Sequence, residues 1–123
     1  MSPKSFIGKN EAELLSSLQK RIGALRKQRG FTLDPERVTL LLVEEVGEIA
    51  RQLKRTWSPN YESYSPDAMA EELADVLFVL LGLSDVLNID IGDALKRKTA
   101  SDHKREWKSI ESPIPPKHSS ETH

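Results

Sequence analysis

Apolar and polar residues recur with the roughly 3.6-residue period of an α-helix through most of this chain, and no segment shows the strict alternation of a strand. Four helical segments are separated by short polar or glycine-containing turns. We expect helices over residues 10–29, 35–57 and 66–87, and a fourth from residue 91 onwards. Four helices joined by short connections predict an all-α fold, an antiparallel four-helix bundle.

Local capping signals define where these helices begin and end. Asn10, with Glu13 three residues later, resembles a capping box, and Gly30 is a natural helix stop. Asp34-Pro35 and Ser65-Pro66 each place an N-cap residue before a proline at the first helical position. Two signals, an N-cap residue and a first-turn proline, therefore predict the start of the second helix and of the third.

Two short acidic phrases interrupt the apolar stripes of the second and third helices. They read Glu44-Glu45-Val46-Gly47-Glu48 and Glu71-Glu72-Leu73-Ala74-Asp75. One such phrase alone is more often a solvated charged face. Because both copies have the same phase against an apolar stripe, packing the two helices should bring four carboxylates together at the edge of the core: Glu45, Glu48, Glu72 and Asp75. Clustered carboxylates repel one another and favour a hard divalent cation, Mg²⁺ or Mn²⁺, over Zn²⁺.

Residues 76–83 are apolar on every side of the third helix, so one neighbouring helix cannot cover them. We expect a second copy of the chain to supply the cover, in a homodimer or a dimer of dimers. The alternative is a helix buried at the centre of a monomeric bundle. Phe78 and Leu81 should point away from the acids, and Gly47 and Ala74 should allow close helix approach.

Composition narrows the classes of function. The 123 residues carry a net charge of -1, which favours neither a nucleic-acid partner nor a membrane surface. The chain has no cysteine and no apolar run long enough to span a bilayer, so we expect a cytoplasmic protein. Residues 1–109 should form the folded domain, and the proline- and serine-rich residues 110–123 a disordered tail.

Over roughly residues 10 to 108, the sequence resembles the MazG-like all-α nucleoside triphosphate pyrophosphohydrolases. The resemblance rests on Glu45-x-x-Glu48 and Glu72-x-x-Asp75 within their apolar surroundings. It implies Mg²⁺-dependent cleavage of a nucleotide between its α and β phosphates, with the four acids as metal ligands. Glu45 or Glu48 would act as the general base, and the sequence does not choose between them.

Members of this family often carry a lysine, an asparagine and an arginine on the fourth helix. The matching residues here are Lys98, Asp102 and Arg105, so the resemblance implies phosphate binding by the two basic residues, while Asp102 departs from the usual asparagine. Trp57 is the aromatic residue that we take as a candidate for substrate binding. Phe31, Tyr61 and Tyr64 are further candidates for stacking on a base.

Two other functions remain open. The chain could be a phosphoribosyl-ATP pyrophosphatase, a related enzyme with similar acidic helices. It could instead be a non-catalytic dimerisation module in which the acids bind a metal only to hold the helices together. Activity on nucleoside triphosphates, in the clearance of surplus or non-canonical nucleotides, is the function that we expect.

Overall fold

The computed structural model describes residues 6–103 and 105–110. These residues form four α-helices and no strand: α1 Lys9–Gln28, α2 Pro35–Lys54, α3 Pro66–Val86 and α4 Ile91–His103. The all-α prediction is confirmed. The predicted tail, apart from Ile110, lies outside the described residues.

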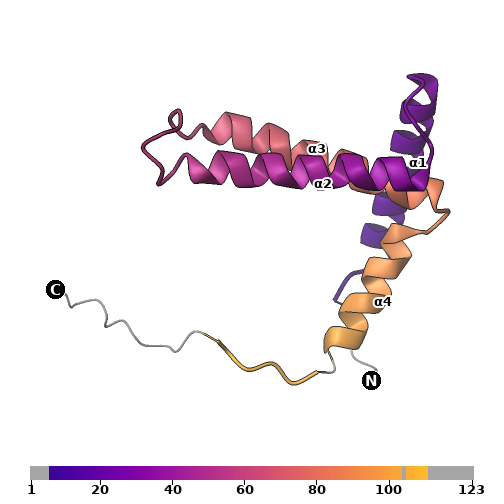
Figure 1. The fold of residues 1–123 in the computed structure, drawn as a ribbon. Coiled ribbons are helices and arrows are strands. Elements are labelled where there is room, and N and C mark those ends of the chain that lie inside the picture. Colours follow the sequence, from indigo (N-terminus) through magenta and orange to yellow (C-terminus); the bar gives the residue numbers. More distant parts are fainter. Residues whose placement is uncertain (1–5, 104, 111–123) are drawn as a thin grey trace.

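The helices are arranged as two antiparallel pairs that cross (Figure 1). α2 and α3 form a long hairpin, and α1 and α4 lie side by side across the end of the hairpin at which α3 finishes. α1 contacts both α3 and α4, so it joins the two pairs. The two acidic phrases lie on α2 and α3, the helices that contact each other along a seam.

Capping hydrogen bonds confirm most of the predicted helix starts. The Asp34 carboxylate accepts a hydrogen bond from the backbone N–H of residue 37 at 3.0 Å, and the Ser65 hydroxyl accepts one from residue 68 at 3.2 Å. The stop at Gly30 is confirmed by its left-handed φ of 73°. The prediction for Asn10 is wrong: α1 begins at Lys9, and the Gly8 N–H donates to Glu11 Oε1 at 2.8 Å. Glycine can occupy an N-cap position without a side chain because an acid three residues later binds its backbone.

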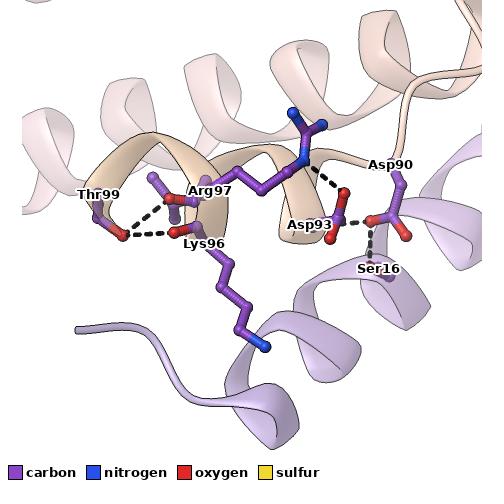
Figure 2. A network of polar contacts seen from close by, with 7 residues as sticks. Ser16, Asp90, Asp93, Lys96, Arg97 and Thr99 are labelled. Atoms are coloured by element: carbon purple, nitrogen blue, oxygen red, sulfur yellow. Dashed lines mark hydrogen bonds and ion pairs between the residues drawn. The ribbon is translucent and has the colours of Figure 1, made fainter. Parts of the chain in front are cut away.

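Polar contacts hold the turn between α3 and α4 against α1. The buried Gln19 donates from Nε2 to the carbonyl of Ile89 at 2.6 Å and accepts at Oε1 from the N–H of Ile91 at 2.9 Å. Beside it, Ser16 donates to Asp90, which also accepts from the N–H of Asp93 and so caps α4 (Figure 2). These bonds, the Ser16 contact above all, lower the pKa of Asp90.

Close approach of helices occurs at Gly92 rather than at Gly47. A Cβ atom added to Gly92 would lie 2.1 Å from the carbonyl oxygen of Ala12, so only glycine lets α4 pack this closely on α1. At Gly47 an added Cβ would meet no described atom within 4 Å, and Ala74 is exposed. The expectation of close packing at Gly47 and Ala74 is therefore wrong for a single chain.

One side of the α2–α3 hairpin presents an apolar face to solvent. Val46 and Leu73 each follow an acid of the seam, Glu45 and Glu72, by one residue, or about 100° around the helix. In antiparallel helices that pack against each other, this rotation turns both residues to the same side. The large apolar side chains on this side are between 38% and 53% exposed: Val46, Leu53, Leu73, Leu77 and Leu80. We call this set the apolar face.

Candidate functional site

Three carboxylates meet on the seam between α2 and α3. Glu45 projects from α2, and Glu72 and Asp75 project from α3, one turn apart. One oxygen from each lies within 4.8 Å of the others. Three of the four acids predicted from the sequence are thus brought together, and we call them the three-acid cluster.

The surroundings of the three-acid cluster disfavour the negatively charged form of its carboxyl groups. Desolvation raises the pKa of Glu45, and the charges of Asp75, Glu72, Glu48 and Glu44 raise it further. Within the described ranges, no lysine or arginine forms an ion pair with the three acids. An all-oxygen donor set without a basic partner fits a hard divalent cation. The cluster can therefore hold such an ion, and residues 45, 72 and 75 are its candidate ligands.

Glu48, the fourth predicted ligand, lies outside this cluster. Its carboxylate pairs with the Nε of Arg51, one turn further along α2, at 3.3 Å. Both side chains are substantially exposed, at 42% and 63%, so the pair is weak and can separate at little cost. Glu48 is thus held one turn away from the cluster, with one carboxylate oxygen paired to Arg51.

A hollow of about 310 Å³ opens beside the cluster, between α1 and the hairpin. Its walls combine acidic, basic and apolar side chains: Glu45, Asp75, Arg26, Thr32, Phe31, Leu41, Phe78 and Val79. The expectation that Phe78 points away from the acids is wrong, because Phe78 lies one turn after Asp75 on the same side of α3. Leu81 is buried, with 1% exposure.

Arg26 also lines this hollow, although no motif in the sequence identified it as a site residue. Gln19, Gly23 and Arg26 are all buried in α1, at the spacing i, i+4 and i+7. A charged residue in phase with a buried stripe was the signal that could have identified it. Among the aromatic candidates, Phe31 lines the hollow, whereas Trp57 is 72% exposed at the far end of α2.

The predicted phosphate-binding residues lie elsewhere in the chain. Lys98 Nζ is 3.4 Å from an oxygen of Asp102, and Arg105 Nη1 is 3.8 Å from the same oxygen. Lys98 also borders a second, apolar hollow with Leu77 and Leu95. An aspartate in place of the family's asparagine thus pairs with both basic side chains, and neither lines the hollow beside the three-acid cluster.

The geometry agrees with the family to which the sequence belongs. Residues 33–107 match the MazG nucleotide pyrophosphohydrolase domain, and the chain is a member of this family of hydrolases that act on phosphoanhydride bonds. It is 32% identical to dCTP pyrophosphatase 1 of Bos taurus over 108 residues, which cover 84% of this chain and 63% of the bovine protein. It is 30% identical to the uncharacterized protein YpjD of Bacillus subtilis (strain 168) over 91 residues, or 72% of this chain and 79% of YpjD.

No solved structure matches the chain significantly. Among the described residues, none of the helices has the length and apolar character needed to cross a membrane. The match to dCTP pyrophosphatase 1 leaves more than a third of the bovine protein's length uncovered.

Proposed function

We propose that the chain is a Mg²⁺-dependent nucleoside triphosphate pyrophosphohydrolase that releases pyrophosphate and a nucleoside monophosphate by cleavage between the α and β phosphates. The observation that supports this most directly is the three-acid cluster, which opens onto a hollow walled by Phe31 and Phe78. A metal site beside an aromatic hollow suits a ligand with a phosphate chain at one end and a flat ring at the other.

Glu45, Glu72 and Asp75 would hold the ion, with Mn²⁺ as an alternative to Mg²⁺. Such an ion, when bound there, would neutralise phosphate charge and lower the pKa of water. We assign the role of general base to Glu48, since the three-acid cluster is committed to the ion and Glu48 lies one turn away. When Glu48 leaves Arg51 to take the proton, the freed guanidinium becomes available to phosphate oxygens.

We propose deoxynucleoside triphosphates as substrates and dCTP as the first to test, because the bovine relative is named for dCTP. Clearance of surplus or modified nucleotides in the cytoplasm is the role that this activity would serve. Lys98 and Arg105 can contribute to phosphate binding only if they leave Asp102 or act on a neighbouring chain. Trp57, which is far from the hollow, could take part only in the latter way.

We further propose that the chain is a homodimer or a dimer of dimers in which the apolar face packs against a second copy. Five large apolar side chains on one side of a hairpin form a patch that isolated proteins rarely expose. The hollow bordered by Leu77, Leu95 and Lys98 continues the same surface onto α4. A partner on this side would leave the three-acid cluster accessible.

The decisive experiment is pyrophosphate release with Mg²⁺ over a panel of common and modified nucleoside triphosphates that includes phosphoribosyl-ATP. We expect turnover of a deoxynucleoside triphosphate, abolished in Asp75→Asn and in Glu48→Gln, with the fold preserved in both variants. Turnover of phosphoribosyl-ATP alone would instead identify the chain as a phosphoribosyl-ATP pyrophosphatase. Mg²⁺ binding without pyrophosphate release from any compound would overturn the enzymatic proposal in favour of a metal-held dimerisation module.

A further inference from the structure

Arg26 is a buried cation without an anionic partner. The residue is 2% exposed, and no ion pair joins it to a carboxylate in the described part of the chain. Its one hydrogen bond runs from Nη2 to the carbonyl oxygen of Thr32 at 3.1 Å, and its buried Nε has no partner. Burial lowers the pKa of Arg26. Leaving a buried charge uncompensated costs several kcal/mol as a rule, so its retention calls for an explanation.

The surrounding chain makes room for this side chain. A Cβ atom added to Gly82 of α3 would lie 2.5 Å from Cδ and 2.7 Å from Nε of Arg26, so a larger residue there would displace the arginine. The guanidinium lies 5.5 Å from the ring centroid of Phe31 and 5.9 Å from that of Phe78. These contacts hold it at the wall of the hollow that Glu45 and Asp75 also line. Cation–π contacts offset part of the burial cost, but they satisfy no N–H donor.

The place of Arg26 relative to the acids decides which part of a nucleotide it meets. Phe78 neighbours both: it is three residues, about 4.5 Å of helical rise, beyond Asp75 on α3, and Arg26 lies over its ring. Phosphates bound through a metal at the three-acid cluster would direct the sugar and base away from the acids, towards the aromatic rings. A flat base fits among apolar and aromatic side chains, whereas a phosphate would be desolvated there.

We propose that Arg26 reads the base of the substrate, by donating two N–H groups to two adjacent acceptors on one edge. Cytosine offers such an edge at O2 and N3, and guanine at O6 and N7. Adenine, thymine and uracil have no edge with two adjacent acceptors, because each ring acceptor or carbonyl is flanked by a donor or by carbon. Arg26 is therefore a specificity-determining residue for nucleotides with a two-acceptor edge. This inference rests on the proposed function, since it names the substrate class of the same site.

The first test uses the unaltered protein and changes single atoms of the substrate. The rate constant kcat/KM is measured for dCTP and dGTP, and for 3-deaza-dCTP and 7-deaza-dGTP, in which carbon replaces one ring acceptor. At about 1–3 kcal/mol for a bidentate contact and 1.4 kcal/mol per tenfold, loss of the contact lowers kcat/KM about 5- to 150-fold for the base that binds. A change below twofold for both deaza analogues would overturn the inference.

The second test is Arg26→Lys, which keeps the charge and most of the stem but loses the two-pronged geometry. We expect it to lower kcat/KM for the preferred nucleotide by the same factor and to leave that of dTTP and dATP within about threefold. Mg²⁺ affinity without nucleotide, measured by titration calorimetry, should not change. An equal loss for every nucleotide would show that Arg26 only supports the fold.

The two proposals fail in distinguishable ways. If the unaltered protein releases pyrophosphate from no nucleotide, the proposed function fails. If it turns nucleotides over but shows the same rate with the deaza analogues, only the assignment of Arg26 fails. Should Arg26→Lys not fold, the deaza substrates still decide the question, because they need no variant.

Discussion

Replacing Glu45 by glutamine should stabilise the metal-free protein, because it removes repulsion within the three-acid cluster. Carboxylate oxygens of Glu45, Glu72 and Asp75 lie within 4.8 Å of one another. At that separation each pair repels by about 0.9 kcal/mol at the dielectric constant of water and about 3.5 kcal/mol at an effective value of 20. Partial exposure favours the lower figure, and neutralising Glu45 removes two pairs. We therefore expect a gain of about 1–2 kcal/mol in the free energy of unfolding.

The pH dependence gives this prediction its sign. The pKa of Glu45 is raised in the folded protein, by desolvation first and by its acidic neighbours second. The folded state therefore binds this proton more tightly than the unfolded state, and ionisation of Glu45 opposes folding. This penalty is absent below about pH 4, the ordinary range of a glutamate, and grows as the pH rises through the raised pKa. The advantage of Glu45→Gln should be largest at neutral pH and disappear in acid.

Thermal unfolding at pH 7 and near pH 4, with and without MgCl₂, measures these terms. A chain of this size shifts its Tm by about 3–6 °C per kcal/mol, so without metal the variant should melt several degrees above the unaltered protein at pH 7. With Mg²⁺ the order should reverse, because an ion at 100 times its Kd stabilises the intact site by about 2.7 kcal/mol.

Glu44→Gln is the matched control for this experiment. It makes the same change in charge one residue away, at an exposed side chain outside the three-acid cluster. Its effect on Tm should be much smaller and nearly independent of Mg²⁺. The reasoning is refuted if Glu45→Gln lowers the Tm at pH 7 without metal, or if Mg²⁺ stabilises it as much as the unaltered protein.

Three further predictions concern Arg51, the C-terminal segment and the apolar face. Arg51→Ala should tighten Mg²⁺ binding by up to about fivefold in titration calorimetry, because Arg51 and the ion compete for the Glu48 carboxylate. An exposed ion pair such as Glu48–Arg51 contributes only about 0.2–1 kcal/mol. Weaker Mg²⁺ binding by the variant would contradict this competition. Truncation after Ile110 should leave the Tm within about 2 °C and kcat/KM within about twofold, because the removed segment has few apolar residues. Leu77→Asp should convert the assembly to monomers or unfold it, and a stable assembly of unchanged mass in light scattering would show that the apolar face is not the interface.

The features that could be predicted from the sequence are those that local chemistry determines. Asp34 and Ser65 accept hydrogen bonds from N–H groups three residues away, so their capping roles follow from neighbouring residues alone. The meeting of Glu45 with Glu72 and Asp75 follows from the helical period and the antiparallel pairing of α2 and α3. Both inferences needed no knowledge of how α1 crosses the hairpin.

The features that were missed depend on packing between distant parts of the chain or on competition between side chains. Glu48 has the right spacing for a metal ligand, but Arg51 on the next turn binds it instead, and helical phase does not reveal that preference. Arg26 is buried because α1 crosses α3 at Gly82, a contact between residues far apart in sequence. Phe78 was placed on the wrong side, although its spacing of three residues from Asp75 already puts it on the acid-bearing side of α3.

The two hydrogen bonds of Gln19 have a consequence for how a ligand would bind. The side-chain amide of Gln19 donates to the carbonyl of Ile89 and accepts from the N–H of Ile91, in the turn between α3 and α4. Gln19 lies two turns before Arg26 on the same side of α1. Neither glutamate nor leucine could make both bonds. The wall of the hollow that carries Arg26 is thereby locked to the helix that carries Asp75 before any ligand arrives. Binding should proceed with little loss of backbone entropy, as to a preorganised receptor rather than to one that closes around its ligand.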